Sequence, residues 1–330
     1  MYRALATILD KTWHCLGFGA TPVEDAIEMI CLARGIDRET LVREPSLITV
    51  INTNSPLRLD GPMSEGLIAM ATWGQPVVAT PFTLAGAMTP ATLAGAITQQ
   101  NAEALFCVAL AQVVRPGTPM VYGAFTSNVD MRTGSPAFGT PEYVKGAFAS
   151  GQMARRYGLP WRSSNATGSN VVDAQAAYES EMAVWGSIMG GVNLLYQGAG
   201  WLEGGLTASY EKLIVDAEIL QMMAEVLTPF TVDEDEIGIE TIAEVGPGGH
   251  FFGSAHTLAR YEQAFYRPMV SDWRNFETWH EDGARTATER ANGLWKRLLA
   301  EFTPPAMDPE VTEALDAFVA RRKREIELGG

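Results

Sequence analysis

The chain has 330 residues, 47% of them hydrophobic and 19% charged, which is typical of a globular protein with a large core and excludes a disordered chain. Its formal net charge of −15 argues against a nucleic-acid or anionic membrane partner, because both need basic patches on the surface. We also expect no signal peptide and no membrane span, since no uncharged run of about 20 apolar residues occurs.

Short β-rich runs alternate with longer helical runs along most of the chain. Thr89 is expected to cap the longest helix, with Pro90 at its first position and Pro116 after its end. The expected strands are Trp13–Phe18, Leu47–Asn52, Pro76–Pro81, Pro119–Phe125, Pro160–Asn165 and Asn193–Gln197. The expected helices are Pro22–Arg34, Met63–Trp73, Pro90–Val114, Pro141–Tyr157, Ala174–Met189, Ala208–Leu227, Glu234–Glu244 and Pro309–Leu328.

This alternation predicts an α/β fold with a parallel sheet, and six successive units favour a TIM-type (β/α)₈ barrel over a Rossmann half. A seventh strand is expected at Thr241–Val245 or near Phe251. Because eight strands are needed, we expect a barrel that lacks its N-terminal part, in residues 1–255, followed by a C-terminal helical extension in residues 256–330. Unpaired strand edges associate readily, so we also expect a homo-oligomer.

The residue inventory argues against several kinds of chemistry. None of the five lysines lies at the carboxyl end of a predicted strand, which disfavours Schiff-base and pyridoxal-phosphate enzymes. No P-loop occurs, Gly198–Glu203 lacks the third glycine of a dinucleotide fingerprint, and the histidines lack zinc spacing, so no bound metal or nucleotide is expected. Cys15, Cys31 and Cys107 are widely spaced, which predicts buried, reduced thiols in a cytoplasmic protein.

Polar residues begin the helix that follows the fifth predicted strand. Asp173, Gln175 and Glu179 lie on its first turns, and in β/α proteins chemistry is placed at this end of the strands. Asp173 and Gln175 are therefore candidate catalytic residues. The ordinary alternative is that Asp173 is a helix N-cap and Glu179 lies on a solvated helix face.

Aromatic and amide residues end the other predicted strands. Ring faces attract a quaternary ammonium group by ~1–2 kcal/mol each when desolvated, so Tyr122, Phe125, Asn165 and Tyr196 are candidates for a substrate cage. The alternative, about equally weighted for Tyr122 and Tyr196, is that these rings fill the core. Glu203, in the loop after Tyr196, adds a candidate catalytic carboxylate.

Arg132, in the run Asp130–Gly134, is a candidate for binding a substrate carboxylate, because a guanidinium matches carboxylate geometry.

Several short runs, Asp130–Gly134 included, are informative when they are taken together in their order along the chain. They are Leu93–Ala96, Gln99–Glu103, Leu110–Gln112, Arg115–Gly117, Asp130–Gly134, Ala154–Pro160, Asp173–Gln175, Leu206–Glu211 and Glu244–Phe251. Together these runs resemble the trimethylamine methyltransferase superfamily, in its branch without pyrrolysine.

The resemblance implies a TIM barrel that moves a methyl group from a quaternary amine, such as glycine betaine, to cobalt(I) in a partner corrinoid protein. It also implies that His250, in the last matching run, binds substrate. Family chains are longer at the N-terminus, and many have Gly and Lys where this chain has Ala177 and Ser180. Two alternatives stay open: a betaine-binding or regulatory homologue without methyl transfer, and a barrel lyase that uses Asp173 and Glu179 as acid and base.

Overall fold

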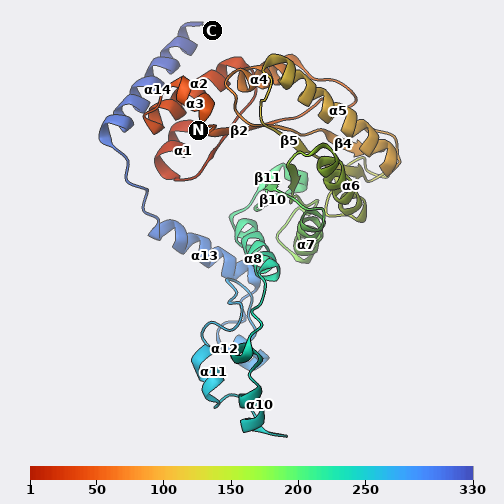
Figure 1. Cartoon of the computed structure of the whole chain (residues 1–330), viewed down its shortest axis with the longest axis vertical. Coiled ribbons are helices and arrows are strands. Elements are labelled where there is room, and N and C mark those ends of the chain that lie inside the picture. The colour runs from red at the N-terminus through yellow and green to blue at the C-terminus, as the bar shows by residue number, and fades with distance from the viewer. Residues whose placement is uncertain (330) are drawn as a thin grey trace.

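The computed structural model describes residues 1–329. Its main sheet has six strands, all parallel, which neighbour one another in chain order. The sheet curls into a half-barrel with helices on its outer side (Figure 1). The six predicted strands are thereby confirmed, and their parallel order and curl are consistent with part of a TIM-type barrel. They are β1 (Trp13–Cys15), β2 (Leu47–Ile51), β3 (Val77–Ala79), β5 (Met120–Gly123), β8 (Trp161–Ser164) and β9 (Leu194–Tyr196).

Capping residues set the ends of the outer helices. Thr140 caps α6 and Gly158 ends it in the left-handed conformation. The prediction of Thr89 as the cap of the longest helix is wrong, because Thr92 accepts from the Gly95 N–H and the helix begins at Leu93. These helices are α1 (Tyr2–Ile8), α2 (Ala20–Arg34), α3 (Arg38–Arg43), α4 (Gly61–Thr72), α5 (Leu93–Val114), α6 (Pro141–Tyr157) and α7 (Ala174–Met189).

The expected strand Pro119–Phe125 is wrong at its end, because the chain leaves the main sheet after Gly123. A Cβ on Gly123 would lie 2.1 Å from the Thr80 Oγ1, so only glycine allows the two segments to approach here. The chain then forms a second, smaller sheet of β4 (Phe82–Ala85), β6 (Phe125–Val129) and β7 (Pro136–Ala137). A short hairpin, β10 (Trp201–Leu202) and β11 (Thr207–Ala208), follows β9.

The C-terminal helix α14 (Pro309–Gly329) returns to the start of the chain. Its Leu315 and Phe318 are buried in the main core with α1, α2 and α4. Arg322 on α14 donates to Asp25 on α2 at 2.7 Å, and Figure 1 shows α14 beside these helices. The tail therefore docks on the outside of the half-barrel, next to the first strand.

The segment between α8 (Tyr210–Leu227) and α13 (Ala287–Glu301) extends away from the half-barrel (Figure 1). The expected seventh strand is wrong: Thr241–Val245 lies in a helix, and no strand lies near Phe251. We call residues 228–269 the arm. Its helices are α9 (Glu234–Ile237), α10 (Ile239–Val245) and α11 (Ala255–Arg260), and α12 (Phe276–Glu281) follows it. Among residues 1–329, no helix has the length and apolar character needed to span a membrane.

Candidate functional site

Two adjoining cavities open at the carboxyl ends of the parallel strands. Their volumes are about 510 and 570 Å³, and both are lined by Val50, Asn52, Tyr196 and Gln197. The first cavity extends towards the second sheet and reaches Phe125, while the second extends past the end of β1. Because they share one wall, the two cavities are lobes of one site at the mouth of the half-barrel, where β/α proteins place their chemistry.

Arg162 on β8 lines the first lobe and is the main polar feature of the site. Only 2% of the residue is exposed. Its guanidinium donates to the Gln197 side chain at 3.2 Å and, at 3.5 Å, to the Ala124 carbonyl, while its Nε has no partner. Burial lowers the pKa of Arg162 to about 10, so the side chain stays charged at neutral pH.

No carboxylate among residues 1–329 forms an ion pair with Arg162, and none contributes to its pKa shift. A buried cation without an anion is costly, because the protein replaces its hydration shell only in part. The guanidinium edge that faces the cavity can therefore gain from an anionic ligand group. A carboxylate is the group whose two oxygens match a guanidinium best.

Strand alternation explains why Arg162 faces the cavity. Its neighbour Trp161 points outward, into a core cluster with Tyr122 and the helices α5 and α6. Tyr122 pairs in register with Trp161 and shares its face, whereas Tyr196 pairs with Ser164, three positions on. The two tyrosines thus lie on opposite faces of the sheet.

Aromatic rings surround the guanidinium. The Arg162 Cζ lies 5.0 Å from the ring centre of Tyr196 and 5.6 Å from that of Phe125. The Phe82 ring stacks on Phe125 at 5.2 Å. Across the mouth, the His14 ring on β1 lies 5.3 Å from Tyr196, so the first and last strands of the sheet meet inside the site.

His14 lines the second lobe and is uncharged. Its Nε2 accepts from the Val50 N–H at 3.3 Å. Burial and the positive charge of Arg162 both lower its pKa below the ordinary value of 6.5, so it is uncharged at neutral pH. With Tyr196 and Trp201, which also line this lobe, His14 offers a ring-lined space to which it adds no positive charge of its own.

The structure brings together only some of the residues predicted from the sequence. Phe125 and Tyr196 line the cavity, whereas Asn165 lines neither lobe; it is buried, and its Nδ2 donates to the Gly198 carbonyl. Tyr122 lies in the core and not at the cavity. Its hydroxyl contacts Gln100 at 3.2 Å and Asn101 at 3.1 Å. Glu203 is exposed on the loop beside the cavity and accepts from Thr207 at 2.8 Å.

Three polar residues at the start of α7 hold the preceding loop in place. Asp173 caps the helix by accepting from the Ala176 N–H at 3.1 Å, which is the ordinary role considered for it. Gln175 donates to Glu179 at 2.9 Å, and Glu179 accepts from the N–H groups of Gly168 and Ser169. None of the three lines either lobe, so any catalytic role for Asp173 or Gln175 stays a prediction.

Arg132 and His250 lie outside the two lobes. Arg132 is exposed in the turn after β6, where its N–H donates to Asp130. His250 is exposed on the arm, and Figure 1 shows this segment extending away from the mouth of the half-barrel. Arg162 and His14 are not among the site residues predicted from the sequence. For Arg162 a usable signal exists, since a charged residue lies inside a predicted parallel strand and such strands are normally apolar.

A buried ion pair anchors the loop that closes one side of the site. The Lys212 Nζ on α8 contacts the Asp216 carboxylate, which also accepts from the Gly200 N–H at 2.8 Å. Lys212 donates further to Ser180 on α7 at 2.6 Å. Gly204 and Gly205, a few residues past this anchor, line the first lobe. The pair therefore fixes the loop between β9 and α8 relative to the cavity.

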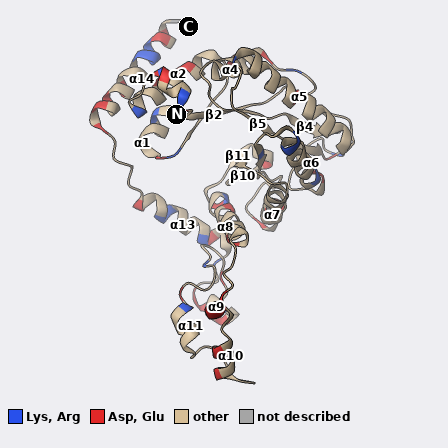
Figure 2. Ribbon diagram, in the orientation of Figure 1, with Lys and Arg blue, Asp and Glu red and all other residues tan. Residues whose placement is uncertain are grey.

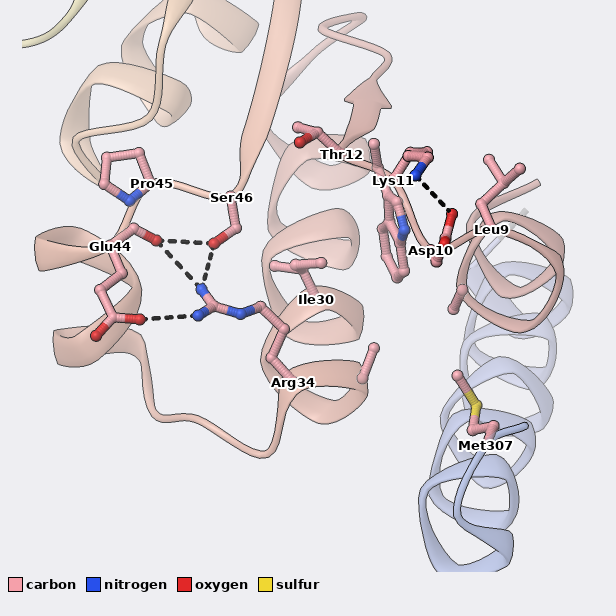
Figure 3. Close-up of a pocket in the computed structure, with 13 residues that line it drawn as sticks. Leu9, Asp10, Lys11, Thr12, Ile30, Arg34, Glu44, Pro45, Ser46 and Met307 are labelled. Carbon is pink, nitrogen blue, oxygen red and sulfur yellow. Dashed lines mark hydrogen bonds and ion pairs between the residues drawn. The ribbon is translucent and has the colours of Figure 1, made fainter. Parts of the chain in front are cut away.

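A separate cavity of about 460 Å³ lies at the opposite, amino-terminal ends of β1 and β2 (Figure 3). Its charged groups are already paired: Arg34 contacts Glu44 at 2.8 Å and also Ser46, and Lys11 contacts Asp10 at 3.4 Å. No group of three or more His, Cys, Asp or Glu residues within 1–329 has a metal-binding arrangement. The mouth cavity is therefore the better candidate for a functional site.

Comparison with known proteins gives a consistent result. The model of the family described as trimethylamine methyltransferase (MTTB) matches residues 1–327. The glycine betaine methyltransferase of Desulfitobacterium hafniense (strain Y51) is 39% identical over 318 residues, which cover 96% of this chain and 66% of that protein. The trimethylamine methyltransferase MttB2 of Methanosarcina mazei is 30% identical over 298 residues, 89% of this chain and 59% of that protein.

The trimethylamine methyltransferase MttB of Desulfitobacterium hafniense (strain DSM 10664 / DCB-2) is 30% identical over 289 residues, which cover 87% of this chain and 58% of that protein. The chain thus spans less than two thirds of the length of each of these curated relatives. The match nevertheless runs through the half-barrel, the arm and the C-terminal helices alike. The chain belongs to the trimethylamine methyltransferase (MTTB) family, a family of methyltransferases.

Proposed function

We propose that the mouth cavity binds a zwitterionic quaternary amine of the glycine betaine class and presents one of its methyl groups for transfer to a corrinoid protein. The observation that carries this proposal is Arg162, a buried guanidinium that faces the cavity without a protein carboxylate. A purely cationic amine would be repelled by this charge. A betaine brings its own carboxylate and is neutral overall, so it relieves the unpaired charge.

The two lobes suit the two ends of such a molecule. The carboxylate binds Arg162 in the first lobe, and the quaternary nitrogen lies against the rings of the second lobe, with Tyr196 as the wall common to both. The neutral state of His14 matters here, because a second positive charge beside the ammonium group would oppose binding. Ring faces and a guanidinium are thereby matched to opposite charges of one ligand.

The chain's own residues act by positioning. A corrinoid carried by a partner protein would supply the cobalt(I) nucleophile, and the betaine nitrogen would become the uncharged nitrogen of a tertiary amine that keeps its carboxylate, so the protein needs no general acid or base. Arg162 fixes the carboxylate and the rings of Tyr196 and Trp201 orient the nitrogen, which aims a methyl group at the open mouth. Such catalysis depends on geometry more than on proton transfer.

The rim of the mouth suits a protein partner. Large apolar side chains are exposed on the loops that follow three strands of the main sheet: Phe18 after β1, Leu57 after β2 and Leu206 after β9. Exposed apolar residues grouped around a site are typical of an interaction surface. These residues support docking of a corrinoid protein over the cavity.

Methyl transfer is tested with the chain, a reduced corrinoid protein and a panel that includes glycine betaine, choline and trimethylamine. We expect demethylation of betaines and no reaction with trimethylamine, with product measured by mass spectrometry. Betaine binding by calorimetry without methyl transfer would indicate a binding homologue instead. Absence of both binding and transfer would contradict the proposal.

Tyr196 and Tyr122 form a matched pair for testing the cage. Tyr196→Leu removes one cavity ring, so betaine affinity should fall about fivefold, or ~1 kcal/mol, with little change in melting temperature. Tyr122→Leu leaves Gln100 and Asn101 without their partner in the core, so it should cost ~2–3 kcal/mol of unfolding free energy and leave betaine affinity unchanged. Calorimetry and urea denaturation of both variants measure the two effects, and the reverse pattern would exclude the assignment.

A further inference from the structure

Glu103 is a buried carboxylate that has no part in the function proposed above. It is the only charged residue of α5, which is otherwise uncharged along its length (Figure 2). Only 3% of the residue is exposed. Its four hydrogen-bond partners are all uncharged, so the negative charge is buried without a cation against it. Burying a charge in this way costs free energy even when donors surround it.

The four donors connect α5 to the loop that follows β2. The Glu103 Oε2 accepts from the hydroxyls of Thr53 and Ser55, the latter at 2.7 Å. Its Oε1 accepts from the Leu57 N–H at 2.8 Å and from the Gln99 Nε2 at 2.9 Å. Thr53 and Ser55 both line the first lobe of the mouth cavity. Thr53 also lines a smaller cavity of about 240 Å³ together with Glu103, so the carboxylate lies directly behind the wall of the lobe.

The carboxylate fixes the polarity of the two hydroxyl groups. An ionised carboxylate only accepts hydrogen bonds, so Thr53 and Ser55 each direct their single proton to Glu103. Either hydroxyl can then offer only a lone pair to a ligand in the first lobe. This side of the lobe therefore repels a carboxylate and favours a positive charge, and the buried charge of Glu103 acts in the same direction.

The opposite polarity comes from β8. Arg162 is the only positively charged side chain among the residues that line the first lobe. β3 and β5 lie between β2 and β8 in the sheet, so the negative and positive groups act from different sides of the cavity. β2 also borders the ring-lined second lobe, through Val50 and Asn52. The cavity is thus polarised in the direction that suits a betaine, with the carboxylate at β8 and the nitrogen near the end of β2.

We propose that Glu103 is a positioning residue that makes the β2 side of the cavity negative and so selects zwitterions over simple anions. The proposal rests on the proposed function, because it takes Arg162 as the site of the ligand carboxylate. Arg162 alone would attract any small carboxylate. With Glu103 behind the opposite wall, a carboxylate binds well only when a positive charge at its other end faces β2. Glu103 acts through Thr53 and Ser55 and does not contact the ligand itself.

Glu103→Gln tests the charge with little change in the shape of the side chain. The Leu57 N–H is a fixed donor, so the glutamine oxygen must face it. The glutamine NH₂ then faces the hydroxyls of Thr53 and Ser55, which accept from it and turn their own protons away. The variant thus removes the negative charge and converts these hydroxyls from acceptors to donors, while their hydrogen-bond partner stays in place.

Calorimetry with acetate and tetramethylammonium measures the effect. Glu103→Gln should raise the affinity for acetate about tenfold, because a repelling charge is removed. In the Arg162→Gln background, where no guanidinium repels a cation, Glu103→Gln should lower the affinity for tetramethylammonium about tenfold. A merely structural defect lowers both affinities, so shifts of opposite sign are specific to a charge that orients the ligand. An acetate affinity that stays the same or falls, or an unchanged affinity for tetramethylammonium, would overturn the proposal.

Glu218→Gln is the matched control. Glu218 on α8 is also 3% exposed, and it accepts only from uncharged donors, namely the N–H groups of Val270 and Ser271 and the Ser271 hydroxyl. None of these three residues lines either lobe. Glu218→Gln should therefore lower the melting temperature without changing the affinity for acetate or tetramethylammonium.

Thr53→Val is a milder second variant, which decides the matter if Glu103→Gln does not fold. It keeps the size of the side chain and removes one lone-pair wall of the lobe, so it should shift both affinities in the same directions by about threefold. Unchanged affinities for folded Thr53→Val would contradict the role of the hydroxyls. If acetate binds neither the unmodified chain nor Glu103→Gln, the carboxylate site at Arg162 fails and this inference fails with it. If acetate binds all variants equally, Arg162 stands and only the role of Glu103 is excluded.

Discussion

Replacing Arg162 with glutamine is expected to lower the affinity for glycine betaine by about a hundredfold, or ~3 kcal/mol, because a charge-assisted contact between a buried guanidinium and the carboxylate is lost. The same change should not destabilise the ligand-free protein. Arg162 is buried without a carboxylate, so its removal also removes the cost of burying an unpaired charge. Calorimetry gives the affinity, and thermal denaturation with and without betaine gives the stability.

Arg132→Gln is the matched control for this experiment, since Arg132 is the arginine that the sequence alone favours for a carboxylate. It is exposed in a turn, and its replacement should leave affinity unchanged. Tetramethylammonium, which has no carboxylate, should bind the unmodified chain poorly and bind Arg162→Gln no worse. If Arg132→Gln lowers the affinity for betaine and Arg162→Gln does not, the ligand carboxylate binds at the exposed turn and not at Arg162.

The frame of the half-barrel follows from local sequence signals. All six strands of the main sheet lie within the predicted ranges, because each begins or ends close to a Pro, Gly or Asn and most are short apolar runs; β8, with Arg162 and two serines, is the exception. The bounds Pro141–Tyr157 and Ala174–Met189 agree with α6 and α7 for the same reason, since Thr140 and Asp173 are strong N-caps. An N-cap bonds to backbone groups within one helical turn, so the start of a helix can be predicted from a short stretch of sequence.

The composition of the site depends on the register between strands, which no single segment contains. Tyr122 and Tyr196 both lie near the carboxyl ends of their strands. Tyr122 nevertheless pairs with Trp161 on the outer face of the sheet, whereas Tyr196 pairs with Ser164 on the inner face. Arg162 is buried only because the sheet curls and its neighbours close around it. Strand alternation shows that Trp161 and Arg162 point to opposite faces of β8. The sequence alone does not show which of these faces the helices cover.

The arm shows a different limit. One helix is expected over Glu234–Glu244, but Gly238 adopts φ 64° and divides it into α9 and α10. The apolar residues there have helical spacing, and periodicity alone does not distinguish a face that packs on its own chain from one that packs on another. Burial within the chain is the property that separates the two, and the arm has almost none.

Asp216→Asn is expected to destabilise the chain by ~3–5 kcal/mol, which is the usual cost of leaving one partner of a buried ion pair without its counter-charge. Lys212 and Asp216 are both fully buried, and the pair ties α8 to the loop beside the cavity. Asparagine keeps an oxygen that can accept from the Gly200 N–H, so the loss reports on the charge of Lys212. Lys212→Met combined with Asp216→Asn should restore part of the stability, and urea denaturation of the double-mutant cycle measures the coupling.

The pH dependence of Asp216→Asn gives an independent test with a defined sign. Burial lowers the pKa of Lys212 below its ordinary value of 10.5, and Asp216 opposes this shift. Without the carboxylate, the folded pKa falls further, so the unfolded chain binds more protons than the folded chain between that lower pKa and about 10.5. Stability of the variant should therefore recover as pH rises from 7 towards 10, relative to the unmodified chain. A deficit that stays constant over this range would show that the loss comes from the Gly200 contact and the loop rather than from an unpaired ammonium group.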